Sequence, residues 1–205
     1  MVEQDRPLGS EVSPPDTTIG VDGPHASARR LILRELDALL AHIDEDACTR
    51  LVAELREAAR IFVTGAGRSG LSAAAFAMRL MHLGLDAHVA GDVTAPAIGS
   101  DDLLLVCSGS GETPTAVLMA ENAARHGART VAVTANAGSR LSRRADLVVH
   151  LAEYSQDHEP GGSRQFVGTL FEQGALLFLD SVVLVYQLEY QVDPQEMLAR
   201  HTNLE

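Results

Sequence analysis

Short, mostly aliphatic runs recur between residues 61 and 150, separated by stretches in which apolar residues follow a helical period. Such continuous runs are typical of strands that are buried on both faces of a sheet. The pattern predicts five strands, at residues 61–64, 87–90, 103–107, 130–134 and 147–150. It predicts helices at residues 69–83 and 113–126 and a short helical turn at residues 139–143. Strands that alternate with helices indicate an α/β fold, a three-layer αβα sandwich around a five-stranded parallel sheet.

Helical periodicity also flanks the strand region. Apolar residues recur at a helical period from residue 29 to residue 43, and further helices are predicted at about residues 48–55, 169–189 and 194–200. Residues 1–27 are rich in proline, glycine and acidic residues, so we expect a flexible N-terminal arm. Residues 28–205 then form a single domain with extra N- and C-terminal helices. These helices exceed what the sheet needs for cover, and we expect them to build a homo-oligomer, a dimer or a tetramer.

The charge balance narrows the function classes. The formal net charge is -12, which repels phosphate backbones and anionic membranes, so we expect no nucleic-acid partner and no membrane partner. Phosphate groups of small ligands remain possible, because backbone N–H groups and hydroxyls bind them locally. All 16 basic residues are arginine. The absence of lysine excludes Schiff-base chemistry on a lysine and a lysine-dependent P-loop.

A few sequence features predict the cellular compartment of the protein and whether it binds a metal ion. The longest apolar stretch, residues 174–187, is interrupted by Asp180 and predicts a buried helix rather than a membrane span. With two cysteines and no N-terminal signal pattern, the chain is expected to be cytoplasmic. His150, Asp157 and His158 come nearest to a metal cluster, but they lack tight ligand spacing, so no metal site is predicted.

The first predicted strand ends in a glycine-rich loop, residues 65–70, that opens a helix. Its sequence, GAGRSG, matches the pattern with which dinucleotide-binding proteins hold a pyrophosphate. Asp92 lies near the end of the next strand, about where a ribose-binding acid would stand. A nicotinamide-dependent oxidoreductase is therefore an open alternative on this motif.

A second loop of this kind, residues 108–113, follows the third strand with the sequence SGSGET. Its glycines permit close approach of an anion, and Ser108, Ser110 and Thr113 offer hydroxyl donors. The helix that follows directs its positive end toward the ligand, so a phosphate can be bound without a lysine. Alternatively, the hydroxyls only cap the helix and Glu112 is an acid of its first turn. Two strand–loop–helix units in one small sheet favour the ligand site.

These two loops, within residues 63–70 and 108–113, resemble those of the SIS (sugar isomerase) family. Segments at residues 78–84, 168–173 and 200–205 resemble the 6-phospho-3-hexuloisomerases in particular. The resemblance runs from about residue 28 to the end. It implies the SIS fold and the cofactor-free interconversion of D-arabino-3-hexulose 6-phosphate and D-fructose 6-phosphate, in the ribulose monophosphate pathway of formaldehyde fixation. The alternative is a non-catalytic SIS module that binds a sugar phosphate. The implied contacts to the sugar phosphate are Gly67, Arg68, Ser69, Ser108, Gly109, Ser110 and Thr113.

The implied reaction needs a base for a carbon-bound proton and a group that shuttles protons between two oxygens. The resemblance assigns the base to Glu172 and the shuttle to His201, with His82 in reserve. Spacing alone instead favours a structural role for Glu172, either as an ordinary acid at the N-terminus of a helix or in a capping box with Thr169. A histidine near a chain end is, by itself, usually a solvated side chain.

Overall fold

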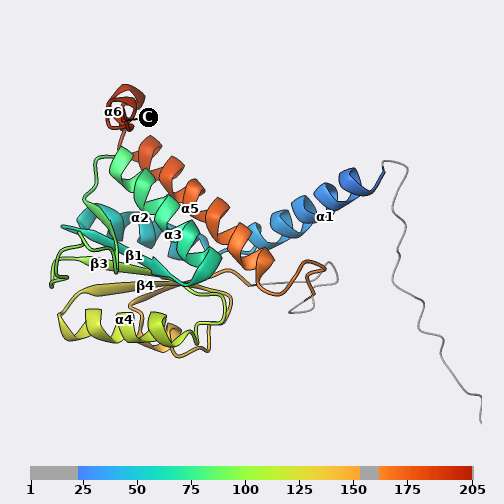
Figure 1. The fold of residues 1–205 in the computed structure, drawn as a ribbon, viewed down its shortest axis with the longest axis horizontal. Helices are drawn as coiled ribbons and strands as arrows, with labels where there is room; N and C mark the ends of the chain where they lie inside the picture. The colour runs from blue at the N-terminus through green and yellow to red at the C-terminus, as the bar shows by residue number, and fades with distance from the viewer. Residues whose placement is uncertain (1–22, 153–161, 205) are drawn as a thin grey trace, which may run out of the picture.

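Five parallel strands form the centre of the computed structural model, which describes residues 23–152 and 162–204 (Figure 1). The strands are β1 (Ile61–Gly65), β2 (Ala87–Val89), β3 (Leu103–Cys107), β4 (Arg129–Thr134) and β5 (Leu147–His150). They lie in the order β2-β1-β3-β4-β5, and every neighbouring pair is parallel. This arrangement confirms the predicted five-stranded parallel sheet. Its strands are continuous apolar runs, which leave no polar face for solvent, so both faces must be covered.

Helices cover both faces of the sheet. They are α1 (Gly23–Leu40), α2 (Glu45–Glu57), α3 (Gly67–His82), α4 (Pro114–Arg125), α5 (Thr169–Glu189) and α6 (Pro194–Ala199), with a 3-10 turn, η1 (Ser142–Arg144). Helix α1 begins earlier than predicted, so residues 23–27 belong to its first turns rather than to an arm. Pro24 lies in its first turn, where the missing backbone N–H is not needed for an intrahelical hydrogen bond. The turn at η1 starts later than the predicted residue 139, whose hydroxyl accepts a hydrogen bond from the Ser142 amide at 3.1 Å.

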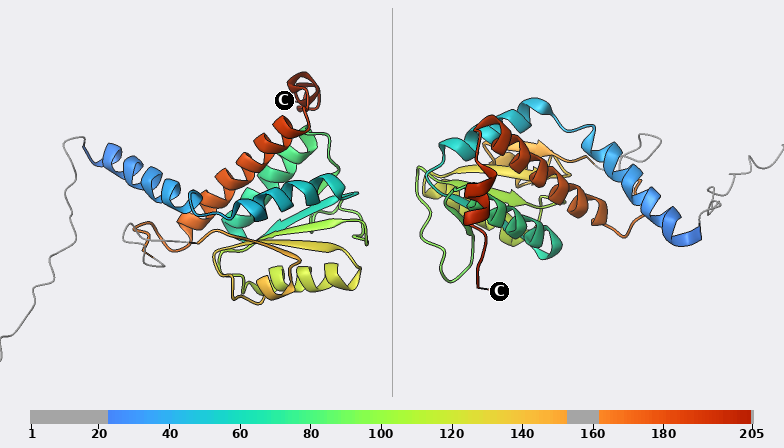
Figure 2. Two further views of the ribbon diagram at one scale, coloured as in Figure 1. Left: turned by 180° about the vertical axis from the view of Figure 1, so that it is seen from behind. Right: turned by 90° about the horizontal axis from the view of Figure 1, so that it is seen from above.

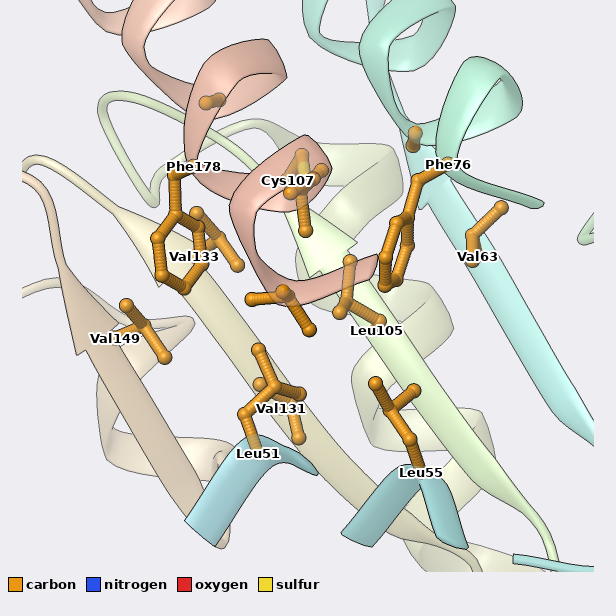
Figure 3. Packing of buried hydrophobic residues seen from close by; sticks show 14 of the residues in the cluster. Leu51, Leu55, Val63, Phe76, Leu105, Cys107, Val131, Val133, Val149 and Phe178 are labelled. Atoms are coloured by element: carbon orange, nitrogen blue, oxygen red, sulfur yellow. The ribbon is translucent and has the colours of Figure 1, made fainter. Parts of the chain in front are cut away.

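Alternate strand residues supply two separate hydrophobic cores. On one face, Phe76 of α3 and Phe178 of α5 lie over Val63, Leu105 and Val133 (Figure 3). On the other face, α4 covers the alternate residues of the same strands. Phe76 and Phe178 are 1% and 2% exposed, and burial of each stabilises the fold by about 1.5–3 kcal/mol. The sheet is thus held from both sides, as the predicted three-layer sandwich requires.

Helix α5 is the most apolar element. By length and composition it could cross a membrane, but 50% of the relevant window is buried inside the protein. Its buried side packs on α3 and α1 as well as on the sheet, in agreement with the prediction of a buried helix. Helix α1 projects away from the body of the domain, and Leu33 on it is 64% exposed (Figures 1 and 2). On α5, the exposed apolar residues are Leu176, Leu177, Leu184, Val185 and Leu188.

Candidate active site

The two predicted loops leave the sheet side by side. Strands β1 and β3 are paired neighbours, and Gly65 at the end of β1 lies opposite Cys107 at the end of β3. This is where the strand order reverses, and in such sheets ligands bind beyond the carboxyl ends of the strands at that point. A pocket of about 230 Å³ lies there. It is lined by Ala66, Ser69, Cys107, Ser108, Gly109, Ser110, Thr113, Val167, Gly168, Phe171 and Glu172.

The loop after β3 is organised around Ser108. Its hydroxyl, which is buried, accepts a hydrogen bond from the Gly111 amide at 3.2 Å and lies 3.1 Å from the Thr113 hydroxyl. Ser110 is exposed, and its hydroxyl accepts from the Glu112 amide at 3.2 Å. The two serines therefore differ: Ser108 shapes the loop from within, and Ser110 faces solvent at the pocket.

Helix α4 begins where this loop ends. Pro114 occupies its first turn as predicted, and the N-cap Thr113 makes no side-chain cap hydrogen bond. Glu112 is not a first-turn acid of the helix either, because it precedes the N-cap, and its carboxylate accepts from the Arg140 amide at 2.8 Å. The simple capping interpretation of this loop is therefore wrong. The Thr113 hydroxyl and the positive end of α4 are left directed at the pocket, where they can receive an anion.

The loop after β1 is compact. A Cβ atom on Gly70 would stand 2.7 Å from the Gly65 carbonyl oxygen, so both positions require glycine for close backbone approach. Ser69 lines the pocket, whereas Gly67, with φ of 58°, does not. Arg68 faces a neighbouring groove of about 260 Å³, which also contains Glu172. The structure thus brings Ser69 to the predicted phosphate site, places Arg68 beside it, and leaves Gly67 in a conformational role.

Glu172 stands between this pocket and the neighbouring groove. Its side chain is 22% exposed, and Oε2 lies 2.7 Å from Nε of Arg68. The capping box expected from spacing does not form. Gly168, with φ of 82°, is the N-cap of α5 and offers no side chain, so Thr169 lies inside the helix. Glu172 is therefore an acid of the first turn of α5 without a cap partner, and its side chain pairs with the arginine of the first loop.

The first turn of α5 supplies a second wall that the sequence analysis missed. A Cβ on Gly109 would come within 3.0 Å of the Phe171 ring, so the ring rests on the backbone of the phosphate loop. Val167 and Gly168 complete this wall. These residues carry no polar side-chain chemistry, and only their position next to Glu172 could have pointed to them. Cys107, which is fully buried, forms part of the pocket floor.

His201 lies at the other end of the domain from Glu172. Its ring stacks on that of His82, with ring centroids 5.3 Å apart and an interplanar angle of 12°. Since His82 ends α3 and Arg68 begins it, about 21 Å of helix separates the two. Burial, then Arg79, then His201 lower the pKa of His82. The structure therefore does not bring His201 or His82 to Glu172 within one chain.

The remaining candidates of the sequence analysis lie elsewhere. Asp92 lines two hollows near β2 and α4 and neither of those next to Glu172. The His150 ring nitrogen Nε2 lies 3.1 Å from the Ala135 carbonyl oxygen, while Asp157 and His158 fall outside the described residues. Within residues 23–152 and 162–204, no group of three or more histidine, cysteine or acidic side chains could hold a metal ion.

Comparisons with known proteins bear on the family of the chain. A family model described as "SIS domain" matches residues 54–167, which include both loops. The chain is 44% identical to a 3-hexulose-6-phosphate isomerase of Mycobacterium gastri over 85% of this chain and 88% of that protein. It is 38% identical to the Bacillus subtilis protein of the same name over 85% and 95%, respectively. A crystal structure from Methanococcus jannaschii, whose name infers 3-hexulose-6-phosphate isomerase function, matches with a TM-score of 0.75 and 32% identity over 87% of this chain and 99% of that one.

Proposed function

Because the chain belongs to the SIS-domain family, we propose that it is a 3-hexulose-6-phosphate isomerase that interconverts D-arabino-3-hexulose 6-phosphate and D-fructose 6-phosphate. The observation that carries this proposal is the position of Glu172, a carboxylate at the edge of a hydroxyl-lined anion pocket. We also propose that this reaction belongs to the ribulose monophosphate pathway of formaldehyde fixation, as the family resemblance implies.

The phosphate of the substrate binds to the loop after β3. Ser110 and Thr113 donate their hydroxyl hydrogens, Gly109 contributes its backbone to the pocket, and α4 contributes its positive end. Ser69 adds a donor from the loop after β1. A dianion held by neutral donors and a helix end requires no lysine, which matches the composition of the chain.

Glu172 performs the proton transfer at carbon. It removes the proton from carbon 2, next to the carbonyl at carbon 3, which gives an enediol, and returns the proton to carbon 3. Arg68 stands 2.7 Å from the carboxylate, where its guanidinium can stabilise the oxygen that becomes negative in the enediolate. A second proton moves between the two substrate oxygens, so that the reaction is balanced without a cofactor.

We assign the oxygen-to-oxygen shuttle to His201 of a neighbouring subunit in a cytoplasmic homo-oligomer, a dimer or a tetramer. The length of α3 separates His201 from Glu172 of its own chain, and the exposed apolar residues of α5 offer a surface for a second copy. Mixing a Glu172→Gln chain with a His201→Ala chain tests this assignment. Hybrid oligomers should recover turnover that neither parent has, and an absence of recovery contradicts action between subunits.

Purified protein incubated with 3-hexulose 6-phosphate should form fructose 6-phosphate, detected by a coupled assay. Binding without turnover would favour the non-catalytic sugar-phosphate module instead. Titration with a nicotinamide dinucleotide should show no saturable binding. Tight binding would instead favour the nicotinamide-dependent oxidoreductase. The two measurements therefore separate the three functions that the loops allow.

A further inference from the structure

Glu35 is a buried carboxylate that the proposed mechanism does not use. It lies on α1 and is 5% exposed. Its oxygens accept three hydrogen bonds, each 2.9 Å long, from the Ser163 hydroxyl, the Arg164 amide and the side-chain amide of Gln165. The Ser163 hydroxyl also accepts from the Gln165 amide at 3.1 Å, which closes the turn around the carboxylate. Glu35 therefore binds three consecutive residues that are far from it in sequence.

The bound segment leads directly into the second wall of the pocket. Only Phe166 and Val167 separate it from Gly168, and their exposed fractions are 87% and 89%, so their side chains hold the segment in place only weakly. The Phe166 carbonyl accepts from the Thr169 amide at 2.9 Å, and this bond connects the segment to the first turn of α5. That turn carries the proposed base, Glu172. The hydrogen bonds to Glu35 thus fix the chain a few residues before the catalytic wall.

Packing of α1 does not itself require a carboxylate at this position. Leu39 contributes an apolar contact between α1 and α5, since its Cδ2 would lie 2.8 Å from a Cβ on Gly174. A buried carboxylate is costly unless it is fully hydrogen-bonded, so its presence needs a reason beyond packing. We infer that Glu35 is a positioning residue, which anchors residues 163–165 so that Gly168 and Glu172 stand correctly against the phosphate loop. The turnover effect expected from this inference rests on the proposed function.

The first test replaces Glu35 with glutamine, which keeps the shape but turns one acceptor into a donor that faces other donors. A displacement of the base by about 1 Å can cost on the order of 100-fold in rate, so kcat should fall by about 10- to 100-fold. Affinity for inorganic phosphate should stay within about twofold, because the sheet loops hold the phosphate. Unchanged kcat in the folded variant would overturn the inference.

Glu54→Gln is the matched control. Glu54 is also partly buried and paired, with Oε2 2.5 Å from Nε of Arg129, but this pair lies at the amino-terminal end of β4, away from the pocket. Its loss should lower thermal stability and leave kcat unchanged. If Glu54→Gln lowers kcat as much as Glu35→Gln does, the effect of Glu35 is general destabilisation and the inference fails.

A reciprocal exchange tests the contact itself. The double variant Glu35→Gln/Gln165→Glu exchanges the two side chains, so that an amide at position 35 can donate to a carboxylate at position 165. Gln165→Glu alone sets two carboxylates against each other and should slow turnover, whereas the double variant should recover at least about threefold over Glu35→Gln. If Glu35→Gln does not fold, Ser163→Ala serves as a second variant, because it removes a single hydrogen-bond donor and leaves α1 intact. Ser163→Ala should lower kcat by a few-fold, and an unchanged kcat would count against the inference.

Hydrogen exchange separates the inference from the proposed function. Backbone amides of residues 163–172 should exchange faster in Glu35→Gln than in Glu54→Gln at equal global stability. This readout requires no substrate. If the wild-type protein fails to isomerise 3-hexulose 6-phosphate, the proposed function fails, but faster exchange in this segment still supports the anchoring role. Equal exchange in both variants refutes that role whatever the substrate is.

Discussion

Replacement of Glu172 by glutamine separates a catalytic carboxylate from a structural one. The amide keeps the size of the side chain and one oxygen that can accept from Arg68, now 2.7 Å from the carboxylate. It cannot accept a carbon-bound proton. Loss of a positioned base typically costs about 10²- to 10⁴-fold in rate, which corresponds to about 3–5 kcal/mol of activation free energy.

The structural cost of the same change is small. The side chains of Arg68 and Glu172 are 61% and 22% exposed, so solvent screens their ion pair, and its contribution to stability is about 1 kcal/mol or less. The α5 cap is unaffected, because Gly168 rather than a side chain forms it. The variant should therefore keep its melting temperature within a few degrees, bind fructose 6-phosphate almost normally, and lose turnover.

Three measurements on one preparation decide the matter: kcat by the coupled assay, affinity for fructose 6-phosphate by calorimetry, and the free energy of unfolding in urea. Glu121→Gln is a suitable control, since Glu121 also pairs with an arginine, Arg144 at 3.4 Å, away from the pocket. Retention of more than about a tenth of wild-type kcat by Glu172→Gln would refute its role as the base. The base would then have to be sought elsewhere, first at His201 from another subunit.

Three further predictions test the site and its surroundings. Ser110→Ala should weaken fructose 6-phosphate binding by roughly 1.5–3 kcal/mol without loss of stability. Ser108→Ala should also destabilise the fold by about 0.5–1.5 kcal/mol, because one hydrogen bond to the Gly111 amide is lost while the bond from this amide to the Ser108 carbonyl remains. Calorimetry that finds both affinities within twofold of wild type would contradict the phosphate loop. Gly70→Ala should destabilise by about 1–3 kcal/mol in urea unfolding, since its Cβ would meet backbone at 2.7 Å, and a neutral result would mean that the loop relaxes freely. The pKa of His82 is lowered in the folded state, whereas in the unfolded chain it has the ordinary histidine value of about 6.5. Below that pH the unfolded chain therefore binds more protons than the folded one, and the free energy of unfolding should fall as the pH drops through that value. His82→Gln should remove this slope between pH 7.5 and 5.5, and an identical slope in both proteins would exclude His82 as its source.

The sheet and its helices could be predicted because burial on both faces demands continuous apolar runs, and those are visible in the sequence. The position of the loop between β3 and α4 could be predicted for a similar reason, since glycines and hydroxyls between a strand and a helix form a local pattern. Its role in phosphate binding stays a prediction. Spacing alone placed Glu172 correctly in the first turn of a helix, but it also allowed a capping box with Thr169, which does not form because Gly168, in a left-handed conformation, takes the cap position.

Contacts between segments that are far apart in the chain could not be predicted from the sequence. The stacking of His201 on His82 depends on where α6 docks, and no local pattern reports it. The same holds for Glu35, whose partners follow it by about 130 residues and carry no recognisable motif. The Phe171 ring on Gly109 is a third case, since an aromatic residue in a helix ordinarily indicates core.

The burial of Cys107 bears on which side reactions the pocket permits. Burial raises the pKa of this thiol to about 12, so it remains protonated at neutral pH even though it forms part of the pocket floor. A protonated thiol is a poor nucleophile, and the chain has no lysine amine to take its place. In the proposed reaction, an open-chain ketose, whose carbonyl is a reactive electrophile, would lie among hydroxyls, amides and a carboxylate that do not form lasting adducts with it. The chemical selectivity of such a pocket would depend on the absence of strong nucleophiles as much as on the proposed base.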